Sequence, residues 1–136
     1  MGTERPAGQH RILLVEDDRL ERMNLTLVLG REGFDLDVAA TAQEAYALLA
    51  RGRYELVLTD IGLPDGDGIG VLHAAKLADA GTKVVLVTGS QTALTSEAAR
   101  IEGAESLLLK PFAMAAFLET VRGLVTNGAD PGTTDF

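Results

Sequence analysis

Five side chains that could take part in chemistry lie at or just beyond the ends of short apolar runs. Glu16 and Asp17 follow the run RILLV, Asp60 follows LVLT, Thr88 follows KVVLV and Lys110 follows SLLL. Short apolar runs bounded by turn-forming residues are typical of buried strands. If those strands are parallel, their carboxyl ends meet at one edge of the sheet, where open α/β sheets place their ligands. We therefore expect the five side chains to converge.

The chemistry of this set is that of phosphoryl transfer. Three carboxylates repel one another unless a cation neutralises them, and an all-oxygen set without His or Cys suits a hard ion such as Mg²⁺. Lys110 would add a fixed positive charge and Thr88 a hydroxyl donor. A metal, an ammonium and a hydroxyl around one carboxylate indicate a phosphoryl-transfer site. Its nucleophile would be Asp60, which would form an aspartyl phosphate.

Each element of this pattern also has a purely structural interpretation. The acids at 16–18 favour the start of a helix, where anions are stabilised. Thr88 to Ser90 is typical of a turn with a helix cap, and Lys110-Pro111 of a strand end. Asp60 alone is more often a turn residue that hydrogen-bonds its own backbone than a nucleophile. Only the convergence of all of them at one edge favours the functional interpretation.

The elements that must position these residues can be read along the chain. Continuous or alternating apolar runs predict five strands, over residues 11–15, 34–39, 56–60, 83–87 and 106–109. Five helices are predicted between and after them. The first carries Leu20, Met23 and Leu27 at helical spacing and ends near Gly33. The second begins at a capping box formed by Thr41 and Glu44.

The remaining three helices have their own apolar lines. One runs from about Gly68 to Asp79, and another from Thr92 to Glu102. The last contains a clean amphipathic stripe. These lines are Ile69, Leu72 and Ala75; Leu94, Ala98 and Ile101; and Met114, Phe117, Leu118, Val121, Leu124 and Val125.

Strands alternating with helices imply βαβ units and a parallel sheet covered on both faces. Right-handed crossovers leave the flavodoxin-like doubly wound (βα)5 fold, with five parallel strands in the order 2-1-3-4-5, as the expected architecture. We expect residues 1–10 to form a disordered leader, 11–126 a single domain, and 127–136 a flexible tail.

Composition limits the classes of partner. A net charge of −8 argues against binding of nucleic acid or an anionic membrane, since both need a basic face. The absence of cysteine excludes disulfides and thiolate metal sites. No apolar leader or membrane-length apolar stretch is present, so the expectation is a soluble, cytoplasmic protein.

Four motifs together carry a family resemblance: ILLVEDD, LVLTDIGLPDGDG, VVLVTGS and GAESLLLKPF. With them the chain resembles a response-regulator receiver domain of two-component signalling, of the stand-alone type, over residues 11–126. The pattern D-x-x-L-P-x-x-D-G followed by a distal K-P-F is specific as a set. The resemblance implies the flavodoxin-like fold and a Mg²⁺-dependent (or Mn²⁺-dependent) phosphoacceptor.

The resemblance also implies roles for individual residues. Asp60 would be the phosphorylated residue, and Glu16, Asp17, Asp60 and the Gly62 carbonyl would hold the metal. The phosphoryl group would meet the switch hydroxyl of Thr88, the small Gly89 and the counter-ion Lys110. A cis peptide is implied between Lys110 and Pro111.

Two departures from the family pattern stand out. Leu107 occupies a position that is commonly aromatic in the family. The route that couples phosphorylation to the output surface is therefore left open by the sequence. Gly62 and Ser90 occupy positions that tune phosphate lifetime, and neither offers a carboxylate or amide to orient an attacking water. A relatively long-lived aspartyl phosphate is therefore our hypothesis.

The resulting functional prediction is a single-domain response regulator. A histidine kinase or a histidine phosphotransfer protein would phosphorylate Asp60, and the signal would pass by protein–protein contact to a target that the sequence does not name. The protein would be a monomer or a weak, phosphorylation-dependent dimer, and would catalyse only its own phosphorylation and dephosphorylation. Leu107 supports the alternative, a pseudo-receiver binding module with weak or absent switching.

An aspartyl phosphatase is disfavoured. It would need an acid or base two residues after the nucleophile, where this chain has Gly62. The sequence Asp65-Gly66-Asp67-Gly68 resembles the D-x-D-G motif of haloacid-dehalogenase-type phosphatases, but no apolar strand directly precedes its first Asp. We interpret it as a turn.

Overall fold

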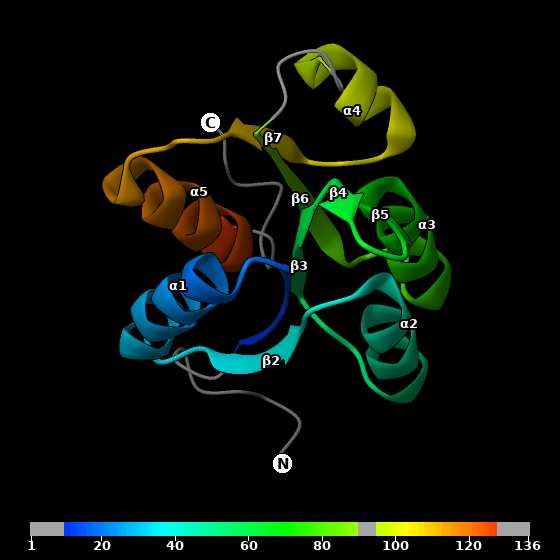
Figure 1. Ribbon diagram of the computed structural model, residues 1–136, viewed down its shortest axis with the longest axis horizontal. Helices are drawn as coiled ribbons and strands as arrows, with labels where there is room; N and C mark the ends of the chain where they lie inside the picture. The colour runs from blue at the N-terminus through cyan, green and yellow to red at the C-terminus, as the bar shows by residue number, and fades with distance from the viewer. Residues whose placement is uncertain (1–9, 90–94, 128–136) are drawn as a thin grey trace.

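A five-stranded parallel sheet forms the centre of the protein. The computed structural model describes residues 10–89 and 95–127. The strands lie in the order β2-β1-β3-β6-β7, and five helices pack around them (Figure 1). The strands are β1 (Arg11–Val15), β2 (Asp35–Ala39), β3 (Leu56–Asp60), β6 (Lys83–Thr88) and β7 (Ser106–Leu109), and the helices are α1 (Arg19–Arg31), α2 (Ala42–Arg51), α3 (Gly68–Ala78), α4 (Ser96–Glu102) and α5 (Met114–Asn127).

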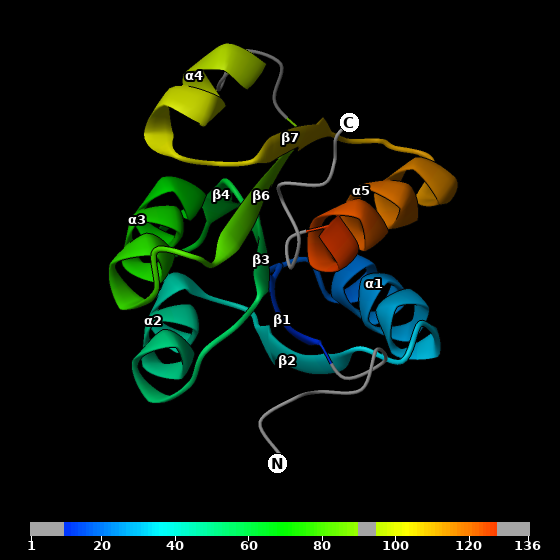
Figure 2. The same cartoon turned by 180° about the vertical axis from the view of Figure 1, so that it is seen from behind.

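The helices divide between the two faces of the sheet. Helices α1 and α5 cover one face, and α2 and α3 the other, as the opposite views in Figures 1 and 2 show. Each face has its own apolar core. Leu25, Leu29 and Phe117 belong to the core under α1 and α5, and Leu72 and Ala75 belong to the core under α2 and α3.

Burial on both faces explains the continuous apolar runs of the sequence. Successive strand residues point to opposite faces, so that Leu13 enters one core while Ile12 and Leu14 enter the other. All three side chains are at most 2% exposed. Full burial of one such side chain is worth about 1.5–3 kcal/mol. The expected fold class and strand order are confirmed, since β6 and β7 are the fourth and fifth strands of the main sheet.

One hairpin was not expected. Two short strands, β4 (Gly62–Leu63) and β5 (Gly66–Asp67), pair in an antiparallel fashion just after β3. The hairpin occupies the segment that we interpreted as a turn, and its carboxylates cap helices. Asp65 accepts hydrogen bonds from the first two amides of α2, and Asp67 accepts one from Gly70 in α3 at 3.0 Å.

The prediction for α1 was wrong in its orientation. Leu20, Met23 and Leu27 are 71%, 55% and 56% exposed, whereas Leu25 and Leu29 are buried. The helix is apolar on both sides, so periodicity alone offers two lines of similar strength. Packing on the sheet buries the line that contains Leu25 and Leu29.

Helix α4 differs from its prediction in start and orientation. Thr95 has an extended backbone and caps the helix through Ala98 N, so the helix begins at Ser96 rather than Thr92. The predicted positions 92–94 lie outside the described residues. Ile101 is 79% exposed, and Ala99 is the residue that enters the core.

The other helices follow their predictions closely. Thr41 accepts from Glu44 N at 3.1 Å, and Glu44 accepts in turn from Ala40 N at 2.8 Å, which completes a capping arrangement around the start of α2. In α5 Phe117 and Val121 are fully buried, whereas Met114 at the end of the stripe is 37% exposed. None of the helices within residues 10–89 and 95–127 has the length and apolar character needed to cross a membrane.

Candidate functional site

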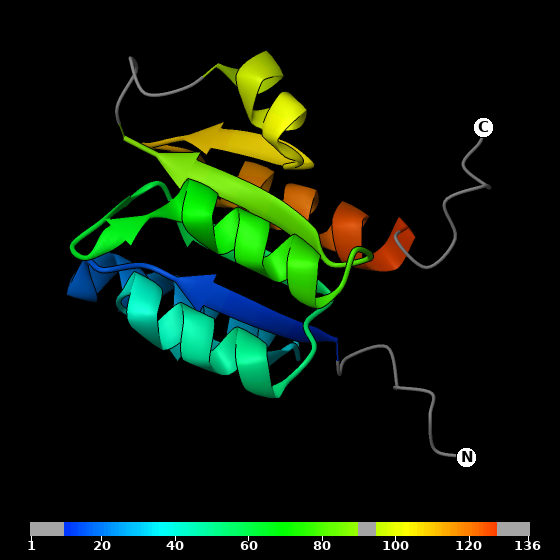
Figure 3. The same cartoon turned by 90° about the vertical axis from the view of Figure 1, so that its right-hand side faces the viewer.

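Strand register brings the predicted residues to one edge of the sheet. Val15 lies beside Thr59 and Asp60 beside Val87, so the residues after β1 and at the ends of β3 and β6 are neighbours. Lys110 follows β7 and donates its backbone N–H to Thr88 O at 2.8 Å. The strand arrowheads in Figure 3 point to this common edge.

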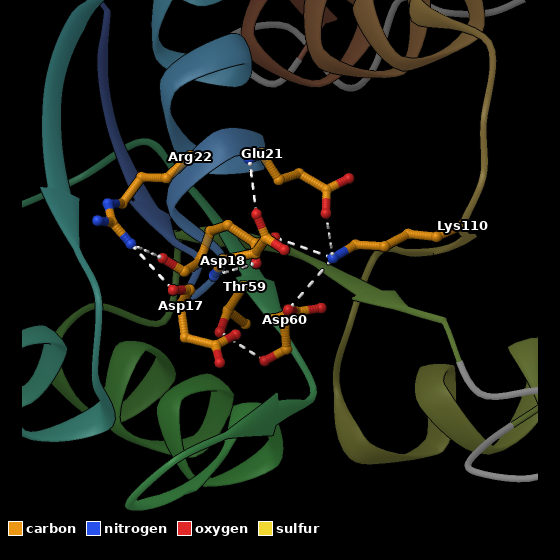
Figure 4. Close-up of polar contacts among 8 residues, drawn as sticks. Asp17, Asp18, Glu21, Arg22, Thr59, Asp60 and Lys110 are labelled. Atoms are coloured by element: carbon orange, nitrogen blue, oxygen red, sulfur yellow. Dashed lines mark hydrogen bonds and ion pairs between the residues drawn. The ribbon is translucent and has the colours of Figure 1, made fainter.

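Three carboxylates meet at the edge. One oxygen each from Glu16, Asp17 and Asp60 lies within 4.8 Å of the other two. Glu16 is 2% exposed and Asp60 8% exposed, while Asp17 is open to solvent. Figure 4 shows Asp17 and Asp60 side by side below the start of α1. An all-oxygen set with one accessible member fits a hard divalent cation, which keeps several waters when bound.

Gly62 lies at the start of β4, two residues after Asp60. It is exposed, and a Cβ added to it would meet no atom within 4 Å. The space around Gly62 is therefore open, and the role of its carbonyl as a metal ligand stays a prediction.

Lys110 is shared among three acids. Its Nζ lies 3.0 Å from Glu16 Oε1, 3.3 Å from Asp60 Oδ2 and 2.9 Å from Glu21 Oε1 (Figure 4). Burial of the ammonium favours its neutral form, but the hydrogen bonds that it donates to Glu21 and Glu16 and the charges of Asp60 and Glu16 outweigh burial and raise the pKa of Lys110. Lys110 is therefore a permanent cation beside Asp60.

The acidity of Asp60 is strongly altered. Burial, the charge of Glu16 and a hydrogen bond with Glu16 raise the pKa of Asp60 to about 7, although Lys110 acts in the opposite direction. One ammonium thus leaves the carboxylate cluster short of positive charge. A bound divalent cation would supply the missing charge and favour the ionised, nucleophilic form of Asp60.

Arg22, which the sequence analysis did not single out, and Asp18, one of the acids expected to favour a helix start, lie beside the acidic pair. Arg22 donates to the backbone carbonyls of Glu16 at 2.9 Å and Asp17 at 3.2 Å. Asp18 caps α1 by accepting from Glu21 N at 3.0 Å. The spacing Asp18-x-x-Glu21 is that of a capping box, which was the available signal for this helix start. No sequence pattern places Glu21 on Lys110.

A glycine packs against the backbone of Asp60. A Cβ at Gly68 would lie 2.2 Å from Asp60 O, so the first turn of α3 can approach the end of β3 only without a side chain there. Gly68 N also donates to Ile61 O at 2.8 Å. Because this close contact fixes the carbonyl of Asp60, α3 helps to position the candidate nucleophile.

The remaining predicted residues surround Lys110. Thr88 is 4% exposed at the end of β6, and a Cβ at Gly89 would meet Lys110 Cβ at 3.9 Å, an ordinary contact. The peptide bond between Lys110 and Pro111 is cis. Ser90, invoked for phosphate lifetime, lies outside the described residues.

Leu107, at the position that is commonly aromatic in receivers, is partly buried. It pairs with Leu86 in the sheet and packs against the core under α2 and α3. An aliphatic side chain of this size already has apolar partners on its own face of the sheet.

Comparisons with known proteins identify the family. The model of the response regulator receiver domain matches residues 12–122, and the chain belongs to this family. It is 36% identical over 115 residues to the transcriptional regulatory protein PmrA of Pectobacterium parmentieri, covering 85% of this chain and 52% of the relative. It is 35% identical over 126 residues to BasR of Escherichia coli K12, and the match covers 92% of this chain and 56% of BasR. The chain thus spans about half the length of these curated relatives.

Solved receiver domains have the same fold. A CheY-like receiver domain protein from Methanospirillum hungatei superposes with a TM-score of 0.84 at 30% identity, over 90% of this chain and 98% of that chain. The response regulator TrrA from Thermotoga maritima, solved in complex with Mg²⁺–BeF, gives a TM-score of 0.75 at 28% identity, over 85% of this chain and 98% of TrrA. Receiver domains of this family are the phosphoacceptors of two-component signalling.

Proposed function

We propose that this chain accepts a phosphoryl group on the carboxylate of Asp60 from the phosphohistidine of a histidine kinase or a histidine phosphotransfer protein. The P–N bond of the donor breaks and a P–O bond to Asp60 forms, while the imidazole leaves and takes up a proton. The observation that carries this proposal is the placement of Asp60. It is a buried carboxylate between a permanent ammonium and two further acids that can share a cation.

The surrounding residues have distinct roles in this reaction. Lys110 neutralises the phosphoryl oxygens as charge develops on them, which is electrostatic stabilisation of the transferring group. Thr88 offers a hydroxyl donor from the adjacent strand end, and Gly89 leaves room for the phosphoryl group. Glu16, Asp17, Asp60 and the carbonyl of Gly62 would hold Mg²⁺ or Mn²⁺, which supplies further positive charge when bound.

The output passes by contact with another protein. The net charge of −8 disfavours nucleic acid as a direct partner of this chain. Relatives of about twice this length are transcriptional regulators; for this chain we propose signalling in the cytoplasm through protein–protein contact. It would be a monomer or a weak dimer after phosphorylation.

A second candidate is a pseudo-receiver that binds a partner without a phosphorylation switch. Leu107 is the observation that favours it, because a half-buried leucine lacks the large ring that commonly reports phosphorylation. The complete set of Asp60, Lys110, Thr88 and the acidic pair favours the phosphoacceptor.

The test is labelling from a small phosphodonor. Purified protein is incubated with labelled phosphoramidate and Mg²⁺, and with chelator in place of Mg²⁺. We expect Mg²⁺-dependent label that hydroxylamine removes, as is typical of an acyl phosphate, and none in Asp60→Asn. Asp65→Asn is the matched control, since Asp65 is a nearby carboxylate engaged in capping α2.

Label that survives Asp60→Asn would refute the assignment of the nucleophile. Label that appears in the wild type without any change in its amide NMR spectrum would favour the pseudo-receiver instead. Absence of label from the wild type with Mg²⁺ would contradict the phosphoacceptor function itself.

A further inference from the structure

Lys110 contacts a third acid, Glu21, in addition to Glu16 and Asp60. Glu21 was not among the site residues that the sequence predicted. Glu21 projects from the first turn of α1, and its Oε1 lies 2.9 Å from Lys110 Nζ. That distance is shorter than the 3.3 Å between Nζ and Asp60 Oδ2. An ammonium group has three hydrogens to donate. Glu16, Glu21 and Asp60 therefore occupy all of them.

A phosphoryl group on Asp60 needs the same ammonium. Its oxygens must either take over the hydrogen now directed to Asp60 or displace another carboxylate. Of the three acids Glu21 has the most exposed side chain, at 34%, compared with 2% for Glu16 and 10% for Asp60. Water can replace Lys110 around Glu21 more readily than around the two buried acids. Glu21 is thus the partner that is most easily displaced.

We infer that Glu21 is a positioning residue that holds Lys110 in the unphosphorylated protein and weakens the binding of the phosphoryl group. The inference rests on the proposed phosphorylation of Asp60, and it adds that Glu21 opposes binding of the phosphoryl group there. Whether Lys110 leaves Glu21 or keeps it, the carboxylate opposes the incoming anion. It either competes for the hydrogen-bond donor or stays as a negative charge on the far side of the ammonium.

Replacing Glu21 with glutamine separates charge from structure. Glutamine keeps the length and helix propensity of the side chain but removes one negative charge next to Lys110. An anion at the site should then bind more tightly. A cation held by Glu16, Asp17 and Asp60 should bind less tightly, because Lys110 is less neutralised. A general loosening of the site would weaken both ligands, so changes of opposite sign are specific to the electrostatic role.

The size of the effect follows from the geometry. Two ligands of one ammonium, each about 3 Å from it, are within about 6 Å of each other. At that distance, in a site open to solvent on one side, loss of one charge should change affinity by about three- to tenfold. The change should shrink as salt is added.

The experiment uses calorimetric titration of the whole chain. Mg²⁺ is titrated alone, and beryllofluoride, a phosphoryl analogue, is then titrated at saturating Mg²⁺, at low and at high ionic strength. The variants are wild type, Glu21→Gln and Glu119→Gln. Glu119 is the matched control, an exposed acid on α5 whose loss removes the same charge away from Lys110.

We expect Glu21→Gln to bind beryllofluoride about three- to tenfold more tightly and Mg²⁺ more weakly, with Glu119→Gln unchanged. Equal beryllofluoride affinity in wild type and Glu21→Gln, or a loss of affinity for both ligands, would overturn the inference. If the wild type itself bound no beryllofluoride, the proposed function would fail, and that outcome is separate from the comparison between variants.

Discussion

Asp60→Asn should stabilise the folded protein above about pH 7. The structure raises the pKa of this carboxyl from its usual 3.8 to about 7, chiefly by burial and by the charge of Glu16. Folding therefore favours the protonated acid, and ionisation of Asp60 costs folding free energy. Asparagine has nearly the same shape and carries no charge, so the variant avoids this cost.

The sign and size follow from proton linkage. A raised folded-state pKa contributes stability below the unfolded pKa, near pH 4, and this contribution is lost as pH rises through about 7. A shift of about three units corresponds to at most about 4 kcal/mol. Because the site can relax and water can enter it, we expect a smaller gain, of about 1–3 kcal/mol, in the free energy of unfolding at about pH 8. At about pH 4.5 the gain should be smaller.

Urea unfolding followed by circular dichroism measures this difference, at both pH values and with a chelator present. Asp65→Asn is the control with the opposite sign. Hydrogen bonds from the backbone of Gln43 and Ala42 lower the pKa of Asp65. Loss of the Asp65 carboxylate should therefore lower the free energy of unfolding at neutral pH. The difference in stability between wild type and Asp65→Asn should diminish as pH falls through the acid range.

Added Mg²⁺ should reduce the difference in free energy of unfolding between wild type and Asp60→Asn. A ligand of the folded state stabilises the protein that binds it better, and we expect that protein to be the wild type. An asparagine variant that is less stable than wild type at about pH 8, or equally changed at both pH values, would show that Asp60 is not under electrostatic strain. The acidic edge would then gain no stability from neutralisation by a divalent cation.

Three further substitutions, one of them a control, test the shape of the site. Gly68→Ala places a methyl group 2.2 Å from Asp60 O, so we expect a loss of about 1–3 kcal/mol in urea unfolding and slower labelling of Asp60. Gly89→Ala is its control, since the added Cβ meets Lys110 Cβ at 3.9 Å, and equal stability of the two variants would contradict the steric argument. Gly62→Asn should shorten the half-life of the aspartyl phosphate, measured by loss of label, because its amide can orient a water; an unchanged half-life would count against the long-lived phosphate.

Strand positions and the location of the site could be predicted from sequence. Strands buried on both faces have continuous apolar runs, and the polar residue after each run then marks the edge of the sheet. The predicted order placed Glu16, Asp60, Thr88 and Lys110 together without any knowledge of distances. The structure brings them into the same cluster because parallel strands share one direction.

Helix rotation and side-chain competition could not be predicted. Leu20, Met23 and Leu27 form an apolar line as regular as that of Leu25 and Leu29, and only the sheet distinguishes them. The partnership of Glu21 with Lys110 joins α1 to the end of β7, and it depends on that rotation. Contacts of this kind follow from packing, and local patterns do not encode them.

Hydrogen bonding also bears on the question that the sequence left open about Asp60, whether it is a turn residue or a reactive group. Asp18, Asp65 and Asp67 accept backbone amides at the starts of α1, α2 and α3. Such bonds stabilise a carboxylate and make it a structural cap. Asp60 has the side chain of Lys110 as its hydrogen-bond donor, and its pKa is raised. A carboxylate whose charge is stabilised by a lysine rather than by backbone amides gains from any further cation, and this need is what distinguishes the candidate nucleophile from the capping acids around it.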